Sequence, residues 1–271
     1  MNNTEDKSIC VLGAGNLGIS IARGIVRADI ASPDALILTR RHLESISNLE
    51  KEGFSITSQN KAAVEHSKLI FICVQPSQVS ALIDEIKESL HEDQALVSVV
   101  TGVDLSGIAE LTGQDLPIIR AMPNTAVAVG ESMTCISANS KGKKNLQYVE
   151  SIFKALGDTL IIDESLMQAA TVLGASGIAF FMRYLRAATQ GGIQMGFHPE
   201  EAQKIAVQTA KGAASLIIEN ESHPEMEIDK VTTPRGCTIE GLNEMEHQGF
   251  SSSLIKGLMT SYHKIFQISK Q

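Results

Sequence analysis

Three glycines near the N-terminus have the types and spacing needed to bind the phosphates of a dinucleotide. The stretch GAGNLG at 13–18 fits the pattern G-x-G-x-x-G, directly after an apolar run and at the start of a helical pattern. Gly13 would make the tight turn, Gly15 would let the backbone approach a pyrophosphate, and Gly18 would allow close helix–strand packing. The same pattern also occurs in purely structural turns, but its place between a strand and a helix favours a cofactor-binding loop.

The end of the second predicted strand carries the residues that distinguish NAD from NADP. NAD sites usually place an Asp or Glu about 20 residues beyond the glycines, where it binds the ribose 2′-hydroxyl. This chain has LTRR at 38–41, with Thr39 and Arg40 and no carboxylate. A guanidinium matches the 2′-phosphate of NADP bidentately; the plainer explanation is two solvated arginines at a helix start. We predict that NADPH is preferred, that NADH binds more weakly, and that the preference depends on Arg40.

A second candidate site lies in the stretch DKVTTPRGCTIEGL at 229–242. Small hydroxyl residues, a proline and a glycine gather there, just before another helical pattern. Exposed backbone N–H groups at a helix start can bind an anion without a formal positive charge. The simpler interpretation is a turn followed by a helix, with Thr238 as an ordinary N-cap. Both interpretations stay open on these residues alone.

The elements that position these residues follow two different patterns along the chain. In the first half, apolar runs at 8–13, 35–40, 68–74, 95–100 and 117–122 alternate with helical patterns at 16–28, 42–52, 77–90 and 104–112. Continuous apolar strands that alternate with helices are typical of a parallel, doubly wound sheet. Runs at 133–138 and 159–163, with a helix at 143–156 between them, would extend this Rossmann-like α/β sheet.

After residue 163 the strand signals stop, and helical patterns cover 164–195, 198–220 and 239–269. We therefore predict two domains: an NADP-binding domain at 1–163 and an all-α domain at 164–271. Small residues such as Gly191 and Gly192 suit close contact between helices. Because an all-α half of this size would expose much apolar surface, we expect it to mediate a homodimer or a higher homo-oligomer.

Composition excludes several classes of partner and site. The formal charge of −8 argues against nucleic acid, which requires a basic patch. The four cysteines are far apart and form no C-x-x-C pair, so we expect neither a disulfide nor a metal site. The N-terminus is polar, and no apolar run approaches the roughly 20 residues that a membrane helix needs. We expect a cytoplasmic protein with no membrane partner.

The stretches IRAMPNTAVAVGESMT (119–134), VQPSQV (74–79) and HPEMEIDKVTTPRGCT (223–238) resemble pyrroline-5-carboxylate reductases. The resemblance extends over nearly the whole chain, with the motifs in the same order. It implies NADPH-dependent hydride transfer to the C=N bond of 1-pyrroline-5-carboxylate, which gives L-proline, the last step of proline biosynthesis. The substrate would be a small cyclic imine.

The resemblance also implies roles for individual residues. The loop before the last helices would hold the substrate carboxylate, and Thr238 would be the catalytic hydroxyl beside the imine nitrogen. The implied substrate-binding residues are Val231, Thr232, Thr233, Gly236, Cys237 and Thr238. The predicted cofactor-binding residues are Gly13, Gly15, Asn16, Leu17, Gly18, Thr39, Arg40, Asn60, Val74, Gln75, Pro76, Met122, Pro123 and Asn124.

Some positions depart from the family pattern. Gln75 stands in place of a lysine, Arg235 in place of a glycine, and Cys237 in place of a small residue or threonine. These departures leave open a non-catalytic NADP-binding paralogue that acts as a sensor or scaffold. A β-hydroxyacid dehydrogenase is disfavoured, since that chemistry needs a lysine in the first long helix and 164–195 contains none.

Overall fold

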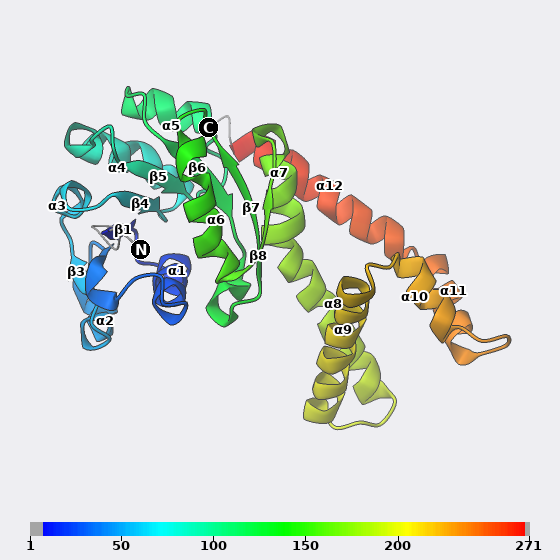
Figure 1. Cartoon of the computed structure of the whole chain (residues 1–271). Helices are drawn as coiled ribbons and strands as arrows, with labels where there is room; N and C mark the ends of the chain where they lie inside the picture. The colour runs from blue at the N-terminus through cyan, green and yellow to red at the C-terminus, as the bar shows by residue number, and fades with distance from the viewer. Residues whose placement is uncertain (1–7, 269–271) are drawn as a thin grey trace. The chain divides into compact units, whose positions relative to one another are not determined.

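The structure, a computed structural model, describes residues 8–268. It contains one eight-stranded sheet of order β3-β2-β1-β4-β5-β6-β7-β8, in which the six strands from β3 to β6 in this order run parallel to one another (Figure 1). The chain moves outward from β1 to β2 and β3 and then crosses to β4 on the other side of β1. Ligands of such sheets bind where the strand order reverses, at the carboxyl ends of the strands. The strands are β1 (Ile9–Leu12), β2 (Leu36–Thr39), β3 (Ser55–Thr57), β4 (Leu69–Ile72), β5 (Ala95–Ser98), β6 (Ile118–Met122), β7 (Ser132–Ala138) and β8 (Gly157–Ile161).

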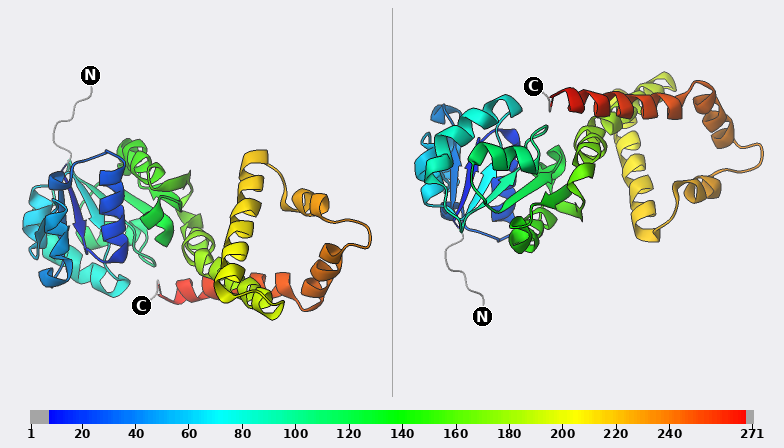
Figure 2. Two further views of the ribbon diagram at one scale, coloured as in Figure 1. Left: turned by 90° about the horizontal axis from the view of Figure 1, so that it is seen from below. Right: turned by 90° about the horizontal axis from the view of Figure 1, so that it is seen from above.

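Helices cover both faces of the sheet (Figure 2), because alternate residues of each central strand pack on opposite sides. Ile9 and Val11 of β1 face a core completed by α1, α2 and α6, whereas Cys10 and Leu12 face α3, α4 and α5. The predicted Rossmann-like α/β fold is therefore confirmed. The helices are α1 (Asn16–Arg27), α2 (Asn48–Lys51), α3 (Asn60–Glu65), α4 (Val79–Ile86), α5 (Leu105–Thr112) and α6 (Leu146–Lys154), with short 3-10 segments between them.

The sheet differs from the prediction at one edge, β3, and next to the other edge, at β7. β3 and α3 were not predicted, because β3 is a short edge strand with no buried residue. β7 is antiparallel to β6, with Met122 opposite Cys135. A parallel partner requires a crossover of a dozen or more residues, and the connection 123–131 is too short to provide one. The sheet is thus mostly parallel.

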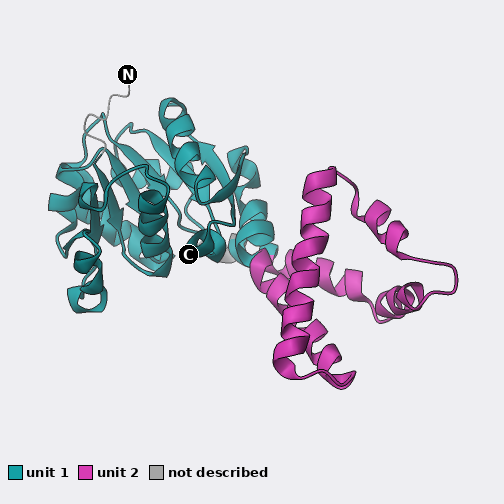
Figure 3. Ribbon diagram, turned by 60° about the horizontal axis from the view of Figure 1, so that its bottom comes forward, with its two compact units in different colours: residues 1–176, 262–271 teal, residues 177–261 magenta. Residues whose placement is uncertain are grey.

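The second compact unit, residues 177–261, consists of helices and their connecting loops and contains no strand (Figure 3). Gly192 of α8 lies so close to α9 that a Cβ atom there would stand 2.9 Å from the Cβ of Ala202. The predicted helix 239–269 is interrupted at Gly249, whose φ of +81° separates α11 from α12. The last residue of that predicted helix, residue 269, lies outside the residues that the structure describes. The helices are α8 (Gly177–Gln194), α9 (Pro199–Asn220), α10 (Pro224–Val231), α11 (Cys237–His247) and α12 (Phe250–Ile268).

The division between the two units falls after residue 176, and residues 262–268 belong with the sheet (Figure 3). The prediction placed the division after 163. The segment between these positions, which includes α7 (Met167–Ala170) and a π-helical turn at Thr171–Ser176, contacts β6 and β7. A buried ion pair fixes its start: Arg120 Nη1 of β6 lies 2.5 Å from Glu164 Oε1, and the Arg120 side chain is 4% exposed.

One helical stretch, Glu164–Gln194, is long and apolar enough by length and composition to cross a membrane. Its most apolar window has a mean hydropathy of 1.5, and 22% of that window is buried. The stretch is not an uninterrupted apolar run of the kind that the sequence-based expectation concerned, because it contains Arg183 and Arg186. A helix that packs against protein passes the same test, so the stretch is weak evidence for a membrane span.

Candidate functional site: a nucleotide pocket and a separate loop

The loop between β1 and α1 is fixed against the end of β2. The backbone N–H groups of Gly13 and Ala14 both donate to the Thr39 carbonyl, at 3.2 and 2.7 Å. Gly13 has φ +95°, a conformation that favours glycine. A Cβ atom at Gly18 would stand 2.7 Å from the Gly13 carbonyl oxygen, so this glycine permits close contact between α1 and the strand. Both positions behave as the glycine pattern predicts.

The open side of this loop fits a phosphate group. Gly15 is the N-cap of α1 and provides no side-chain cap, so the first N–H groups of the helix have no side-chain acceptor. A Cβ atom at Gly15 would meet nothing within 4 Å. Because a helix start with free N–H groups favours anions, the residues present suit the pyrophosphate of a dinucleotide.

A pocket of about 740 Å³ opens beside this loop, within the range of about 300–1,000 Å³ that is usual for ligand sites. It lies at the carboxyl ends of β1, β2 and β4, where the strand order reverses. The predicted cofactor residues that line it are Gly13, Gly15, Thr39, Arg40, Asn60, Val74 and Gln75. The other lining residues are Ala14, Arg41, His42, Ser58, Cys73, Ser77, Gln78, Ala81, Leu82 and Glu85.

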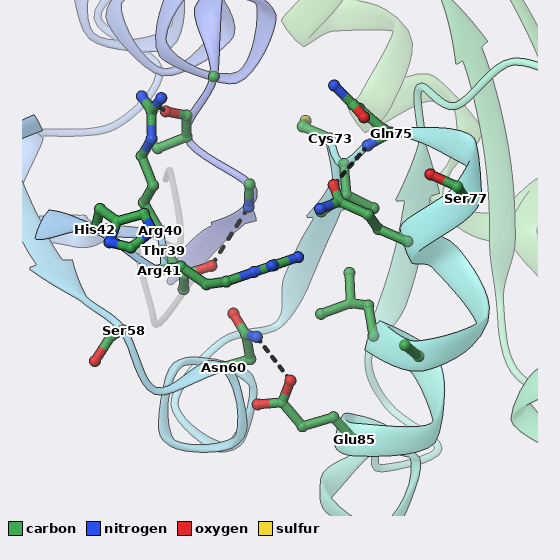
Figure 4. Close-up of a pocket in the computed structure, with 17 residues that line it drawn as sticks. Thr39, Arg40, Arg41, His42, Ser58, Asn60, Cys73, Gln75, Ser77 and Glu85 are labelled. Atoms are coloured by element: carbon green, nitrogen blue, oxygen red, sulfur yellow. Dashed lines mark hydrogen bonds between the residues drawn. The ribbon is translucent and has the colours of Figure 1, made fainter. Parts of the chain in front are cut away.

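Two adjacent arginines reach different parts of the pocket (Figure 4). Arg40 Nη1 donates to the Ala14 carbonyl oxygen at 2.9 Å, so its guanidinium lies against the glycine loop. The Arg41 side chain extends across the pocket instead. No hydrogen bond or ion pair of the Arg41 side chain is found among residues 8–268.

The opposite wall comes from α3 and α4. Asn60 Nδ2 donates to Glu85 Oε2 at 3.0 Å, which leaves the amide oxygen of Asn60 as an acceptor (Figure 4). Gln78, Ala81, Leu82 and Glu85 line the pocket with the i, i+3, i+4, i+7 spacing of one helix face. Glu85 therefore orients a side chain that was predicted to contact the cofactor.

Cys73 lines the pocket but is no nucleophile at neutral pH. Burial raises the pKa of its thiol far above the ordinary value, and the neighbouring Cys10 thiol acts in the same direction. Burial likewise raises the pKa of Cys10 to about 12. Both groups remain protonated thiols at neutral pH and act as small apolar side chains.

Seven predicted cofactor residues lie outside the lining of this pocket. Gly18 is buried in the first turn of α1, Asn16 is exposed at its start, and Leu17 packs partly against the core. Pro76 begins a 3-10 turn (Pro76–Gln78) that Gln75 caps. Their roles stay predictions. The remaining three are Met122, Pro123 and Asn124, at the end of β6.

Asn124 is held by the protein through three groups. Its N–H donates to Ser132 Oγ at 3.0 Å, and its Oδ1 accepts from the Ala126 N–H at 2.9 Å. Its Nδ2 donates to the Gly174 carbonyl oxygen at 3.2 Å, in the π-helical turn. Asn124 thus ties the end of β6 to the segment that leads into α8.

The predicted substrate loop belongs to the second unit. Val231 ends α10, and the Thr232 N–H donates to the Ile228 carbonyl at 3.1 Å. Thr233 to Gly236 form a β-turn that is closed by a 2.9 Å hydrogen bond from the Gly236 N–H to the Thr233 carbonyl. Arg235 occupies the third position of this turn with φ +58°. Type II turns require a positive φ there, which explains why glycine would suit this position.

Thr238 is not an N-cap. Helix α11 begins at Cys237, its N-cap is Gly236, and no side chain caps it. The capping interpretation of Thr238 is therefore wrong. Its hydroxyl makes no hydrogen bond within the described part of the chain, and the exposed Cys237 is a free thiol. The first N–H groups of α11 and the Thr238 hydroxyl are thus available to a ligand.

Several lining residues could not be identified from the sequence. Ser58 follows β3, which the pattern missed. The face formed by Gln78, the N-cap of α4, and by α4 up to Glu85 could have been recognised by its helical spacing, had the helix been placed beside the carboxyl end of β4. Arg41 was noted next to Arg40 but not assigned to the site.

Comparisons with known proteins show which family the chain is similar to. A family described as NADP oxidoreductase coenzyme F420-dependent matches residues 8–102. A second, described as pyrroline-5-carboxylate reductase dimerisation, matches residues 164–268. Pyrroline-5-carboxylate reductase 2 of Dictyostelium discoideum is 46% identical over 276 residues, which cover 96% of this chain and 92% of that protein. The chain belongs to the pyrroline-5-carboxylate reductase family.

Further relatives of this family differ in how much of their length this chain covers. Pyrroline-5-carboxylate reductase 1 of D. discoideum is also 46% identical, but the chain spans only 50% of its length. A pyrroline-5-carboxylate reductase structure from Coxiella burnetii covers 98% of this chain and 100% of its own, with 27% identity and a TM-score of 0.88. The structure of the Plasmodium falciparum pyrroline carboxylate reductase with NADP bound covers 98% of this chain and 99% of its own, with a TM-score of 0.90. At 23% identity, this likeness shows the fold alone.

Proposed function

We propose that this chain is an NADPH-dependent pyrroline-5-carboxylate reductase, an oxidoreductase that reduces the C=N bond of 1-pyrroline-5-carboxylate to L-proline in proline biosynthesis. The observation that carries the proposal is the 46% identity to pyrroline-5-carboxylate reductase 2 of D. discoideum over nearly the full length of both chains. The glycine loop, the free start of α1 and the two pocket arginines support NADPH as the cofactor.

Reduced nicotinamide supplies the hydride when the cofactor is bound. The protein's task is to bind and orient both reactants, and such positioning can contribute several kcal/mol to catalysis, up to roughly 7–11. In our proposal the glycine loop holds the pyrophosphate. The residues Met122, Pro123 and Asn124 support the nicotinamide end, and Asn60 contacts the adenosine ribose.

The loop 231–238 binds the substrate carboxylate in this proposal. The uncapped N–H groups at the start of α11 are suitable donors, and they carry the partial positive charge of a helix N-terminus. Thr238 is the proposed catalytic residue: its hydroxyl orients the imine nitrogen or passes it a proton from water. Since an iminium ion is already electron-poor, a strong general acid is unnecessary.

We also propose a homodimer or larger homo-oligomer that is built through residues 164–268, which match a dimerisation family. All four cysteines are free thiols, which suits a reducing compartment, and we place the protein in the cytoplasm. Cell fractionation would test that placement.

The decisive experiment is a turnover assay of the purified chain with NADPH and 1-pyrroline-5-carboxylate, which follows the loss of nicotinamide absorbance. Proline formation that depends on both reactants is expected. The assay should be repeated with a six-membered cyclic imine and with NADH to define ring size and cofactor preference. Tight NADPH binding without turnover would contradict the proposal and favour the non-catalytic paralogue.

A further inference from the structure

The two arginines after β2 are adjacent in sequence but differ in their contacts. Arg40 joins the end of β2 to the glycine loop through the 2.9 Å hydrogen bond from its Nη1 to the Ala14 carbonyl. This bond adds to those that the Gly13 and Ala14 N–H groups donate to Thr39. Arg40 is therefore part of the framework that gives the loop its shape.

Arg41 is free to bind a ligand. Its side chain crosses the pocket (Figure 4), and its guanidinium has no partner among the residues that the structure describes. The other charged or titratable lining residues are Arg40, His42, Glu85 and the protonated thiol Cys73, and Glu85 accepts a hydrogen bond from Asn60. The lining thus carries two arginines against one carboxylate, a balance that favours a phosphate.

We propose that Arg41 recognises the 2′-phosphate of the adenosine, and that Arg40 mainly holds the glycine loop in the shape needed by any dinucleotide. This inference rests on the proposed use of NADPH. Arg40 would have to give up its bond to the Ala14 carbonyl to use the same nitrogen on a phosphate, whereas Arg41 gives up none. Cofactor preference therefore depends on Arg41, which revises the sequence-based prediction that it depends on Arg40.

Calorimetric binding tests this division without relying on catalysis. Adenosine 2′,5′-bisphosphate and adenosine 5′-monophosphate differ only in the 2′-phosphate, and NADPH and NADH form a second such pair. Arg41→Ala is expected to weaken the binding of the 2′-phosphorylated ligands roughly 10–150-fold, because a charge-assisted hydrogen bond is lost. The dissociation constants of the ligands without that phosphate should change by no more than about fivefold, the effect expected from removing an exposed charge. Arg41→Lys should recover part of the loss.

Arg40→Ala is the matched comparison, at the neighbouring position and with the same change of charge. It is expected to weaken the binding of both ligands in each pair, with and without the 2′-phosphate, by similar factors. The inference would be overturned if Arg40→Ala selectively weakened binding of the 2′-phosphorylated ligands. It would also be overturned if Arg41→Ala left the ratio of the two dissociation constants in each ligand pair unchanged. If Arg40→Ala fails to fold, the ratio of dissociation constants with and without the 2′-phosphate in Arg41→Ala tests the inference by itself. A wild-type chain that binds neither NADPH nor NADH would instead reject the proposed function.

Discussion

Thr238 is the residue on which the proposed chemistry depends most directly. Thr238→Ala should lower kcat by at least about 100-fold, the usual contribution of a positioned proton donor. The melting temperature should not change, because the hydroxyl has no partner in the described structure and Gly236 is the N-cap. Steady-state kinetics and thermal unfolding measure the two effects. Thr238→Ser keeps the hydroxyl and should retain most activity; a normal kcat in Thr238→Ala would remove the catalytic role.

Asp104 gives the chain a measurable pH dependence. Its carboxylate accepts a 2.7 Å hydrogen bond from the Gly107 N–H at the start of α5. That bond, helped by the Ser106 hydroxyl and opposed by partial burial, holds the pKa of Asp104 below its ordinary value of 3.8. Because the native pKa is lowered, the stabilisation is complete above the unfolded pKa and is lost as pH falls through the native pKa.

The corresponding variant is Asp104→Ala. At pH 7 it should lose about 1 kcal/mol of unfolding free energy, the usual contribution of an N-cap. The difference from wild type should shrink as the pH falls below 3.8. Urea denaturation across this range measures it. Asp115→Ala, which removes only an exposed ion pair with Lys141, is the control and should change little. A difference that grows at low pH would contradict the assignment.

At the scale of elements, the crossing of α8 and α9 depends on one of two neighbouring glycines. A Cβ at Gly192 would stand 2.9 Å from the Cβ of Ala202, whereas one at Gly191 would meet nothing within 4 Å. Gly192→Ala should destabilise the protein by about 1–3 kcal/mol through overpacking. Gly191→Ala should stabilise it by up to about 1 kcal/mol through helix propensity. Thermal unfolding compares them; equal effects would show that the helices separate without cost.

The sequence predicted elements well where burial determines the pattern. β1, β4, β5 and β6 are wholly buried and appeared as continuous apolar runs. β3 has no buried residue, and the direction of β7 depends on the length of the preceding connection, so neither follows from local composition. The glycine loop was predictable because it is continuous in sequence. The α4 wall of the pocket was not, because it depends on which strand neighbours β1.

For the whole molecule, exposed apolar side chains predict self-association. Phe181, Met195 and Ile218 of the second unit are 72%, 77% and 74% exposed, respectively. Contact between copies of the chain would remove such apolar side chains from water. Light scattering at micromolar concentration should show a dimer or a larger oligomer.

Combining Phe181→Asp with Ile218→Asp should shift the chain toward monomer, since a charge in an apolar interface is costly. Val129→Asp is the control: Val129 is 71% exposed but lies in the first unit, so its oligomer should persist. A wild-type chain that remains monomeric at these concentrations would contradict the proposed assembly.

The path of the chain has a consequence for how the protein breaks. Because residues 262–268 belong to the same compact unit as residues 8–176, the helical unit is an insertion whose two ends both return to the sheet-containing part. A single protease cut at Gly249 therefore cannot release the helices as a free fragment. Each product would retain a segment that packs in the first unit, with Ile265, only 7% exposed, in the shorter one. Nicked protein should migrate as two bands after denaturation yet elute intact under native conditions.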